Sequence, residues 1–385
     1  MKKTTCIASL MVCLSMGQAG ALAQNIRIDM NKTYPEKTIS LQKVADVKYI
    51  PLETTDEVLF NGVVTHLSAE GIAGFNKKEG DILVFDGTGK AIASFNHTGQ
   101  GPNEYNKIYH LDVDWKQKEV YVQDNFRQKI RIYALNGSHL RTIDLQETMQ
   151  QGDLYNFSDT HLIYYAQPKS KPVTPYEPVT LLTKKDASKV TLPFTKTDDN
   201  LVKATGGPFG DMKMSAKNVN LLCKKGDEVY VNEVTADVIY RVESNHALTP
   251  VVERTPSYQD ASGQDFFLML TGANARYYFF KRQQALLEFQ GNAASDTKST
   301  YVAYDRKEKL LLNPTFTNED YPSQDISMSK LLQCAGSANR CYLQLDAFKL
   351  KEALAEGKLK GTLKSIAEKL DEEDNPVLMV VEFKK

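Results

Sequence analysis

The segment Gly99–Tyr105 (GQGPNEY) combines backbone freedom with polar side chains, which is the pattern of a loop that meets a ligand. The two glycines, Gly99 and Gly101, let the backbone approach another group closely, and Pro102 fixes the exit of the chain. Tyrosine and tryptophan side chains follow, and such side chains suit recognition of peptides or sugars. The residues expected to contact a ligand are Gln100, Glu104, Tyr105, Tyr109 and Trp115.

A second interpretation makes the same segment a connection between structural units, in which Glu104 satisfies neighbouring backbone N–H groups. This interpretation is favoured, because glycine-rich segments serve tight backbone turns more often than ligand contacts. The aromatic residues have a similar alternative, since strands are rich in aromatic side chains that pack in the core.

The histidines and acidic residues give a weaker pattern. The chain holds six histidines, no H-E-x-x-H motif is present, and His139 and His246 fall at hairpin turns. Four aspartates could gather calcium, but acidic residues at strand ends usually cap turns. The sequence therefore predicts no metal site and no cofactor, and it contains no G-x-S-x-G motif for a hydrolase. The four aspartates are Asp86, Asp112, Asp114 and Asp124.

The amino terminus has the three regions of a secretory leader: a basic start, a short apolar run and the sequence Ala21-Leu22-Ala23 before the cleavage point. Residues 1–23 are therefore expected to be a signal peptide, and the mature chain to be exported to the periplasm, cell surface or medium. A lipoprotein signal ending at Cys13 is the alternative, and bulky Val12 disfavours it. No other run reaches transmembrane length.

Removal of this leader takes away two lysines and no acids, so the formal net charge falls from −1 to −3. A near-neutral chain with interspersed charges is not typical of nucleic-acid binding. Three cysteines remain, and Cys334 and Cys341 flank a turn-like segment where a disulfide is possible in an oxidising compartment; two buried thiols are the alternative. Cys223 reads as a small core residue.

Two hairpin-like stretches, Asp81–Phe95 and Lys129–Ile143, repeat with their turn glycines 48 residues apart. Similar outlines recur around residues 186, 244 and 306. All-strand repeats of this length are typical of a β-propeller with one four-stranded blade per repeat. Gly89 and Gly137 are expected to take positive φ. Both faces of the first hairpin are apolar, whereas Ile130, Ile132 and Ala134 alternate with Arg131 and Tyr133, which predicts a one-sided second hairpin.

The carboxy end departs from the repeat. Helical spacing of apolar residues predicts two helices within 346–371, and Asn375–Phe383 reads as a strand. Val47–Glu53 is also strand-like, so we expect strands from the two ends of the chain to close the ring in one blade. Residues 24–385 are then one domain, because no linker divides them, and we expect a monomer.

Several strings resemble one family: Tyr49–Thr55, Ile82–Lys90, Gly99–Tyr105 and Glu372–Leu378 are similar to the six-bladed, NHL-repeat-like β-propellers exported by Bacteroides-type bacteria. The resemblance implies an all-β, six-bladed ring with a small helical insertion near the carboxy terminus. It supplies no catalytic residues, because the activity of the family is mostly unassigned.

Two functions follow from these patterns. The favoured one is a non-catalytic binding or interaction propeller of the bacterial envelope that holds an envelope protein, a peptide or a glycan at one rim. The alternative is an NHL-like lyase or hydrolase with a metal-assisted site at the axial channel, which would need three histidines to converge on the axis.

Overall fold

A computed structural model describes most of the chain beyond residue 25. The described residues are 26–124, 128–145, 147–167, 175–196, 201–205, 212–215, 221–260, 266–290, 293–294, 298–326 and 340–384. The signal peptide expected at residues 1–23 therefore lies outside the described residues, as does Cys334. The division into a leader and a single domain stays a prediction.

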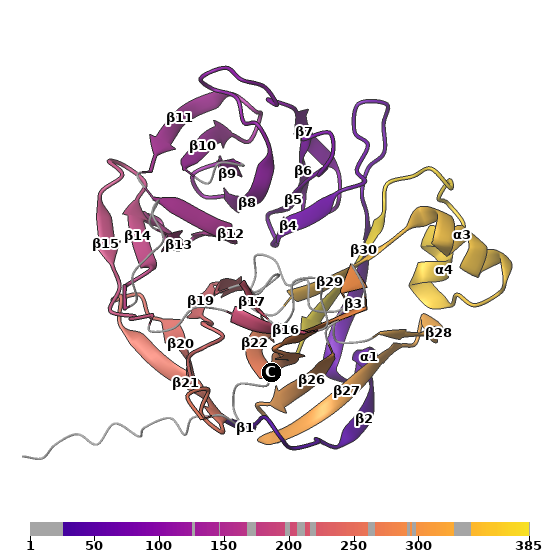
Figure 1. Cartoon of the computed structure of the whole chain (residues 1–385). Coiled ribbons are helices and arrows are strands. Elements are labelled where there is room, and N and C mark those ends of the chain that lie inside the picture. The colour runs from indigo at the N-terminus through magenta and orange to yellow at the C-terminus, as the bar shows by residue number, and fades with distance from the viewer. Residues whose placement is uncertain are drawn as a thin grey trace, which may run out of the picture.

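The first three blades are four-stranded antiparallel sheets whose strands follow one another along the chain (Figure 1). The first comprises β4 (Val63–Leu67), β5 (Gly71–Phe75), β6 (Ile82–Asp86) and β7 (Ala91–Phe95). The second comprises β8 (Ile108–Asp114), β9 (Glu119–Asp124), β10 (Lys129–Ala134) and β11 (His139–Asp144). The third comprises β12 (Thr148–Asn156), β13 (His161–Gln167), β14 (Val179–Thr183) and β15 (Lys189–Thr191).

The fourth and fifth blades are widened by strands from the amino-terminal segment. The fourth comprises β18 (Leu222–Lys225), β19 (Glu228–Val231), β20 (Val238–Val242) and β21 (Leu248–Thr255), and β1 (Ile26–Asp29) pairs in parallel with β21. The fifth comprises β22 (Phe266–Ala273), β23 (Tyr277–Gln284), β26 (Ser299–Asp305) and β27 (Leu310–Asn318). Against β27 lie β2 (Glu36–Ser40), in parallel, and β28 (Tyr321–Ile326).

The sixth blade joins the two ends of the chain. Its strands are β29 (Arg340–Leu345), β30 (Val377–Phe383) and β3 (Ala45–Pro51), and β3 follows the short helix α1 (Leu41–Val44). β3 pairs antiparallel with β30 over its full length, from Ala45 opposite Phe383 to Pro51 opposite Val377. This is the pairing of terminal strands that the sequence predicts, and it closes the ring. Two helices, α3 (Ala347–Ala355) and α4 (Gly361–Ala367), form the predicted insertion between β29 and β30.

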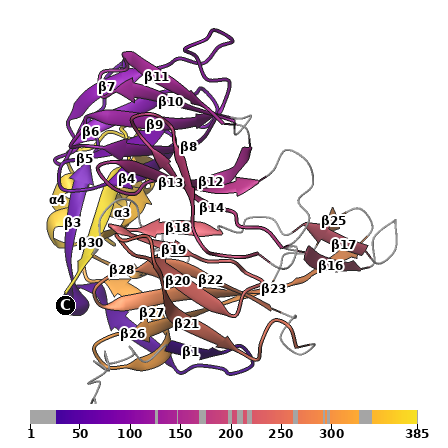
Figure 2. The ribbon, with the colours of Figure 1, turned by 90° about the vertical axis from the view of Figure 1, so that its left-hand side faces the viewer.

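A small extra sheet projects from one face of the ring (Figure 2). It is built from β16 (Leu201–Thr205), β17 (Met212–Ser215), β24 (Leu286–Gln290) and β25 (Ala293–Ala294). Strands alternate in direction within a blade, so connections between blades emerge on the same face as connections from the second to the third strand. We call this the connection face. The extra sheet occupies one connection of each kind, β15 to β18 and β23 to β26, and therefore belongs to that face.

The repeats seen in the sequence are the turns between the third and fourth strands of blades one to five. The turn glycines Gly89 and Gly137 have φ of +92° and +86°, as expected. The sixth blade lacks such a turn because its outer strand, β3, comes from the other end of the chain.

Six hydrophobic clusters of described residues lie between neighbouring blades, one at each interface around the ring. A blade therefore needs two apolar faces. This corrects the expectation of a one-sided second hairpin, because Arg131 and Tyr133 are both buried. Tyr133 packs toward the first blade and donates a hydrogen bond from its hydroxyl to the carbonyl of Asn103 at 2.7 Å. Arg131 is tolerated there because it pairs with Asp124.

Candidate functional site

The segment Gly99–Tyr105 connects β7 of the first blade to β8 of the second, on the connection face. Its two ends are tied together by backbone hydrogen bonds, from Gly99 N–H to the carbonyl of Tyr105 (3.0 Å) and from Tyr105 N–H to the carbonyl of His97 (3.0 Å). The segment is thus a closed loop. Pro102 lies exposed at its tip.

Glu104 has the structural role that the favoured interpretation gave it. Its carboxylate accepts a hydrogen bond from the backbone N–H of Gly101 at 2.7 Å. The carboxylate packs directly over the two glycines: a Cβ atom at Gly99 would lie 1.9 Å from Glu104 Oε2, and one at Gly101 would lie 3.0 Å from Glu104 Cδ. Glycine at these two positions therefore leaves room for the Glu104 carboxylate to pack over the loop.

Tyr105 lies beneath the loop and has no exposed surface. Its hydroxyl donates to the carbonyl of Gly80 (2.8 Å) and accepts from the N–H of His97 (3.0 Å). Burial raises the pKa of this phenol to about 12. These contacts correct the expectation that Tyr105 faces a ligand, because its hydroxyl group already donates one hydrogen bond and accepts another within the protein.

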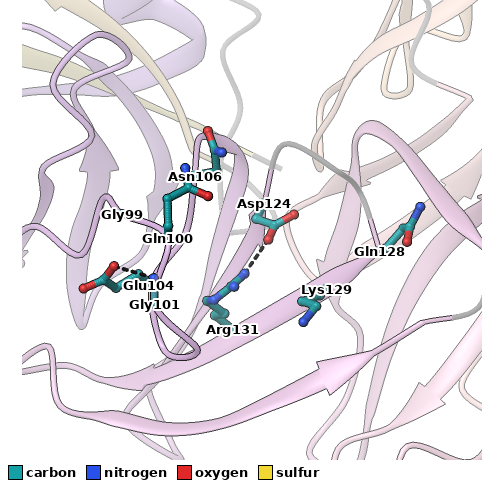
Figure 3. A pocket seen from close by; sticks show the side chains of 9 residues that line it. All are labelled: Gly99, Gln100, Gly101, Glu104, Asn106, Asp124, Gln128, Lys129 and Arg131. Atoms are coloured by element: carbon teal, nitrogen blue, oxygen red, sulfur yellow. Dashed lines mark hydrogen bonds and ion pairs between the residues drawn. The ribbon is translucent and has the colours of Figure 1, made fainter.

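A cleft of about 250 Å³ lies between this loop and the facing ends of β9 and β10 in the second blade (Figure 3). Nine of the described residues line it: Gly99, Gln100, Gly101, Glu104, Asn106, Asp124, Gln128, Lys129 and Arg131. Two of the predicted ligand contacts, Gln100 and Glu104, are therefore at a cleft. Ligand sites for drug-sized molecules are typically about 300–1,000 Å³, so this cleft fits a small part of a larger partner.

The charges of the cleft are balanced internally. Arg131, whose side chain is only 8% exposed, pairs with the buried carboxylate of Asp124, and Figure 3 shows this pair between Gln100 on one side and Gln128 on the other. Glu104 is held by the loop. Lys129 is exposed, and its Nζ atom lies 3.2 Å from Oδ1 of Asp144. Two acidic and two basic residues therefore leave the described part of the lining without net charge.

Three carboxamides distinguish the cleft, those of Gln100, Asn106 and Gln128. Asn106 and Gln128 are half-buried, and Gln100 is exposed. None of the three side chains has a hydrogen-bond partner among the described residues. Each offers one acceptor oxygen and two N–H donors, so the cleft presents unpaired donors and acceptors together.

The remaining predicted aromatic contacts are not at the cleft. Tyr109 is half-buried in β8 and does not line it. Trp115 lies beyond the opposite end of β8, where its ring packs so closely on Gly71 that a Cβ there would be 2.2 Å from Trp115 Cη2. The structure therefore separates Tyr109 and Trp115 from Gln100 and Glu104.

A second polar cluster joins the innermost strands of four blades. Asp112 on β8 receives hydrogen bonds from His66 Nδ1 of the first blade (2.9 Å), the backbone N–H of Asn156 of the third (2.7 Å) and Lys224 Nζ of the fourth (3.1 Å). Burial alone would raise the pKa of Asp112, but Lys224 and His66 outweigh it and hold that pKa far below its usual range. Asp112 is thus an ionised, fully partnered tie between blades.

His110, also on β8, has its Nε2 atom buried without a hydrogen-bond partner among the described residues, and so does His66. Burial, with a contribution from Lys224, lowers the pKa of His110 to about 4, so His110 is neutral near pH 7. Within the part of the chain that the structure describes, no group of three or more His, Cys, Asp or Glu side chains could hold a metal ion.

Sequence reasoning missed Asn106, Gln128, Lys129 and Arg131 as cleft residues, and it considered Asp124 only for calcium. The topology offered a signal, because the β9–β10 connection and the β7–β8 connection must emerge on the same face of the ring.

For the predicted disulfide, Cys341 is buried in β29 and Cys334 lies outside the described residues, so the pairing stays a prediction.

Comparison with known proteins supports the fold. The model of a family described as a domain of unknown function (DUF4934) matches residues 25–382. None of the curated proteins matches the sequence. Among solved structures, a Bacteroides fragilis protein named as an exported protein is 15% identical, with a TM-score of 0.62, and the match covers 94% of this chain and 99% of that one.

A member of another family of unknown function, DUF4221, from Bacteroides vulgatus is 9% identical, with a TM-score of 0.48 and coverage of 89% and 98%. The virginiamycin B lyase of Staphylococcus aureus is also 9% identical, with a TM-score of 0.41 and coverage of 87% and 99%. No helix among the described residues is long and apolar enough to cross a membrane.

Proposed function

Because the chain belongs to the DUF4934 family, whose function is unknown, its activity has to be inferred from its site, and we propose that it is a non-catalytic binding propeller of the bacterial envelope. It recognises an envelope protein, a peptide or a glycan at the connection face, through the cleft between Gly99–Tyr105 and the second blade. The monomer is the binding unit.

The unpaired polar lining of the cleft is the observation that carries this proposal. A carboxamide that has no protein partner and is open to solvent hydrogen-bonds water, which a ligand can replace. Here three carboxamides of one cleft, one exposed and two half-buried, have no partner among the described residues, whereas Arg131 and Lys129 beside them are in ion pairs. A partner that fills the cleft would replace those hydrogen bonds to water.

The setting of the cleft suits a large partner. It opens on the same face as the projecting sheet of β16, β17, β24 and β25, so one partner can contact both. A location in the envelope rests on the predicted leader and on the likeness of the fold to an exported Bacteroides protein.

The alternative, chemistry at the axial channel, is supported by one pair of residues. Asp112 hydrogen-bonds His66 Nδ1, as a carboxylate does when it orients a histidine base. Lys224 and the backbone of Asn156, however, occupy the other carboxylate oxygen. An aspartate that holds four blades together is explained by the architecture alone, so the rim is the better candidate.

A screen of the purified mature protein against peptide and glycan arrays tests the proposal. Every hit is repeated with a cleft variant, Gln100→Ala/Lys129→Ala, and with Lys116→Ala as a surface control in the β8–β9 turn on the other face. We expect binding that the cleft variant loses and the control keeps. Hits that both variants keep, or turnover of a hit that Asp112→Asn abolishes, would overturn the rim proposal in favour of another surface or the channel.

A further inference from the structure

We propose that the cleft recognises the main chain of an extended polypeptide segment, through the carboxamides of Gln100, Asn106 and Gln128. This inference rests on the proposed function and narrows its three kinds of partner to a polypeptide. It predicts that recognition depends on peptide groups and tolerates many side chains.

Complementarity of hydrogen bonding is the first argument. A peptide group presents one N–H donor and one C=O acceptor, and a side-chain carboxamide presents the same two functions. One carboxamide can therefore accept from a backbone N–H and donate to a backbone carbonyl of a bound strand. Three carboxamides around one cleft can satisfy several successive groups of a bound segment.

The absence of surplus charge among the described lining residues is the second argument. Asp124 is neutralised by Arg131, Glu104 is held by the N–H of Gly101, and Lys129 lies near Asp144. An ionic ligand would gain little here and would lose hydration. The lining therefore favours a neutral group that carries both donors and acceptors, as the main chain does.

The composition of the described lining favours a peptide over a glycan. A sugar ring has an apolar C–H face that an aromatic side chain can cover, but none of the nine described lining residues is aromatic. The aromatic residue of the loop, Tyr105, is fully buried, and Trp115 packs on Gly71. A peptide backbone needs no such platform, and a cleft of about 250 Å³ accommodates only a short stretch of it.

Nuclear magnetic resonance of the ¹⁵N-labelled mature chain tests this inference directly. The probes are a capped diglycine (acetyl-Gly-Gly-methylamide), which is a main chain without side chains, and the sugars N-acetylglucosamine and maltose. The readout is the side-chain NH₂ resonances of the three carboxamides, assigned by their loss in single alanine variants. The other side-chain amides of the protein serve as internal controls.

We expect the capped diglycine to shift these resonances and the sugars to leave them unchanged. The triple variant Gln100→Ala/Asn106→Ala/Gln128→Ala should weaken binding at least about tenfold, because it removes several hydrogen bonds at once. If that variant is unstable, Asn106→Asp provides the matched test, since it preserves shape but removes the donors when ionised.

Shifts with a sugar and not with the diglycine would overturn this inference and leave the rim proposal standing. The absence of a shift with any probe would also overturn it, and the array screen would then decide the rim proposal separately. Equal diglycine binding by the triple variant and the unmodified protein would show that the carboxamides are not the recognition groups.

Discussion

Lys224 of the fourth blade reaches Asp112 of the second, with 3.1 Å between Lys224 Nζ and Asp112 Oδ2. The two residues are 112 positions apart in the sequence and their blades are not neighbours. The third blade joins the same carboxylate through the N–H of Asn156, and the first through His66. One ionised side chain therefore ties four of the six blades at their inner edge.

Removal of the lysine tests this tie. Lys224→Met should lower the free energy of unfolding by about 3–5 kcal/mol, because it leaves a buried carboxylate without its cation. Lys225→Met, on the same strand and without an ion pair among the described residues, is the matched control and should change little. Urea unfolding of both variants provides the measurement. Equal stability of the two variants would refute the tie, whereas a smaller loss in Asp112→Asn/Lys224→Met than in Lys224→Met would confirm the coupling.

Acid should destabilise the ring through His110. Its pKa falls from the usual 6.5 to about 4 on folding, so between these values the unfolded chain binds more protons. Stability then rises with pH, and acidification from pH 7 to pH 4 should remove up to about 3 kcal/mol. Thermal unfolding should therefore show a smaller loss on acidification in His110→Asn than in the unmodified protein. A pH dependence that the substitution does not change would assign the effect to other groups.

Closure of the ring predicts that the carboxy-terminal strand is indispensable. Deletion of residues 375–385 removes β30, which pairs with both β29 and β3, and leaves two open sheet edges. We expect the shortened chain to lose its cooperative thermal transition, as followed by circular dichroism. Deletion of Lys385 alone is the control. A shortened chain that melts like the control would disprove closure as the basis of stability.

Two glycines should respond differently to alanine. At Gly99 the added Cβ meets Glu104 Oε2, the end of a flexible side chain that can move, so the loss should be about 1 kcal/mol, the value of the hydrogen bond to Gly101. At Gly62 it meets the carbonyl oxygen of Phe75 at 1.9 Å, and backbone cannot move as easily. Urea unfolding should show a clearly larger loss for Gly62→Ala than for Gly99→Ala. The opposite order would mean that Glu104 is held more rigidly than its contacts indicate.

Local sequence patterns determined the architecture of this protein. The hairpins around Gly89 and Gly137 could be predicted as parts of blades, because alternating apolar residues and a turn glycine define a hairpin within a short stretch of chain. The terminal strands and the helical insertion could also be predicted, since the spacing of apolar residues differs between strands and helices. The parallel pairing of β1 and β2 with the fourth and fifth blades could not be predicted, because the sequence of a short strand does not indicate which sheet edge it pairs with.

Tertiary structure alone decided the site. Gly99, Gly101 and Glu104 form a unit within seven residues, so the sequence could suggest their mutual contact. Three features depend on how whole blades pack: the shared cleft of Gln100 and Gln128, the burial of Arg131 against Asp124, and the ion pair of Lys224 with Asp112. The first and third of these features join residues that lie far apart in the sequence, and no local pattern around either residue indicates its partner. Only the geometry of the closed ring brings them together.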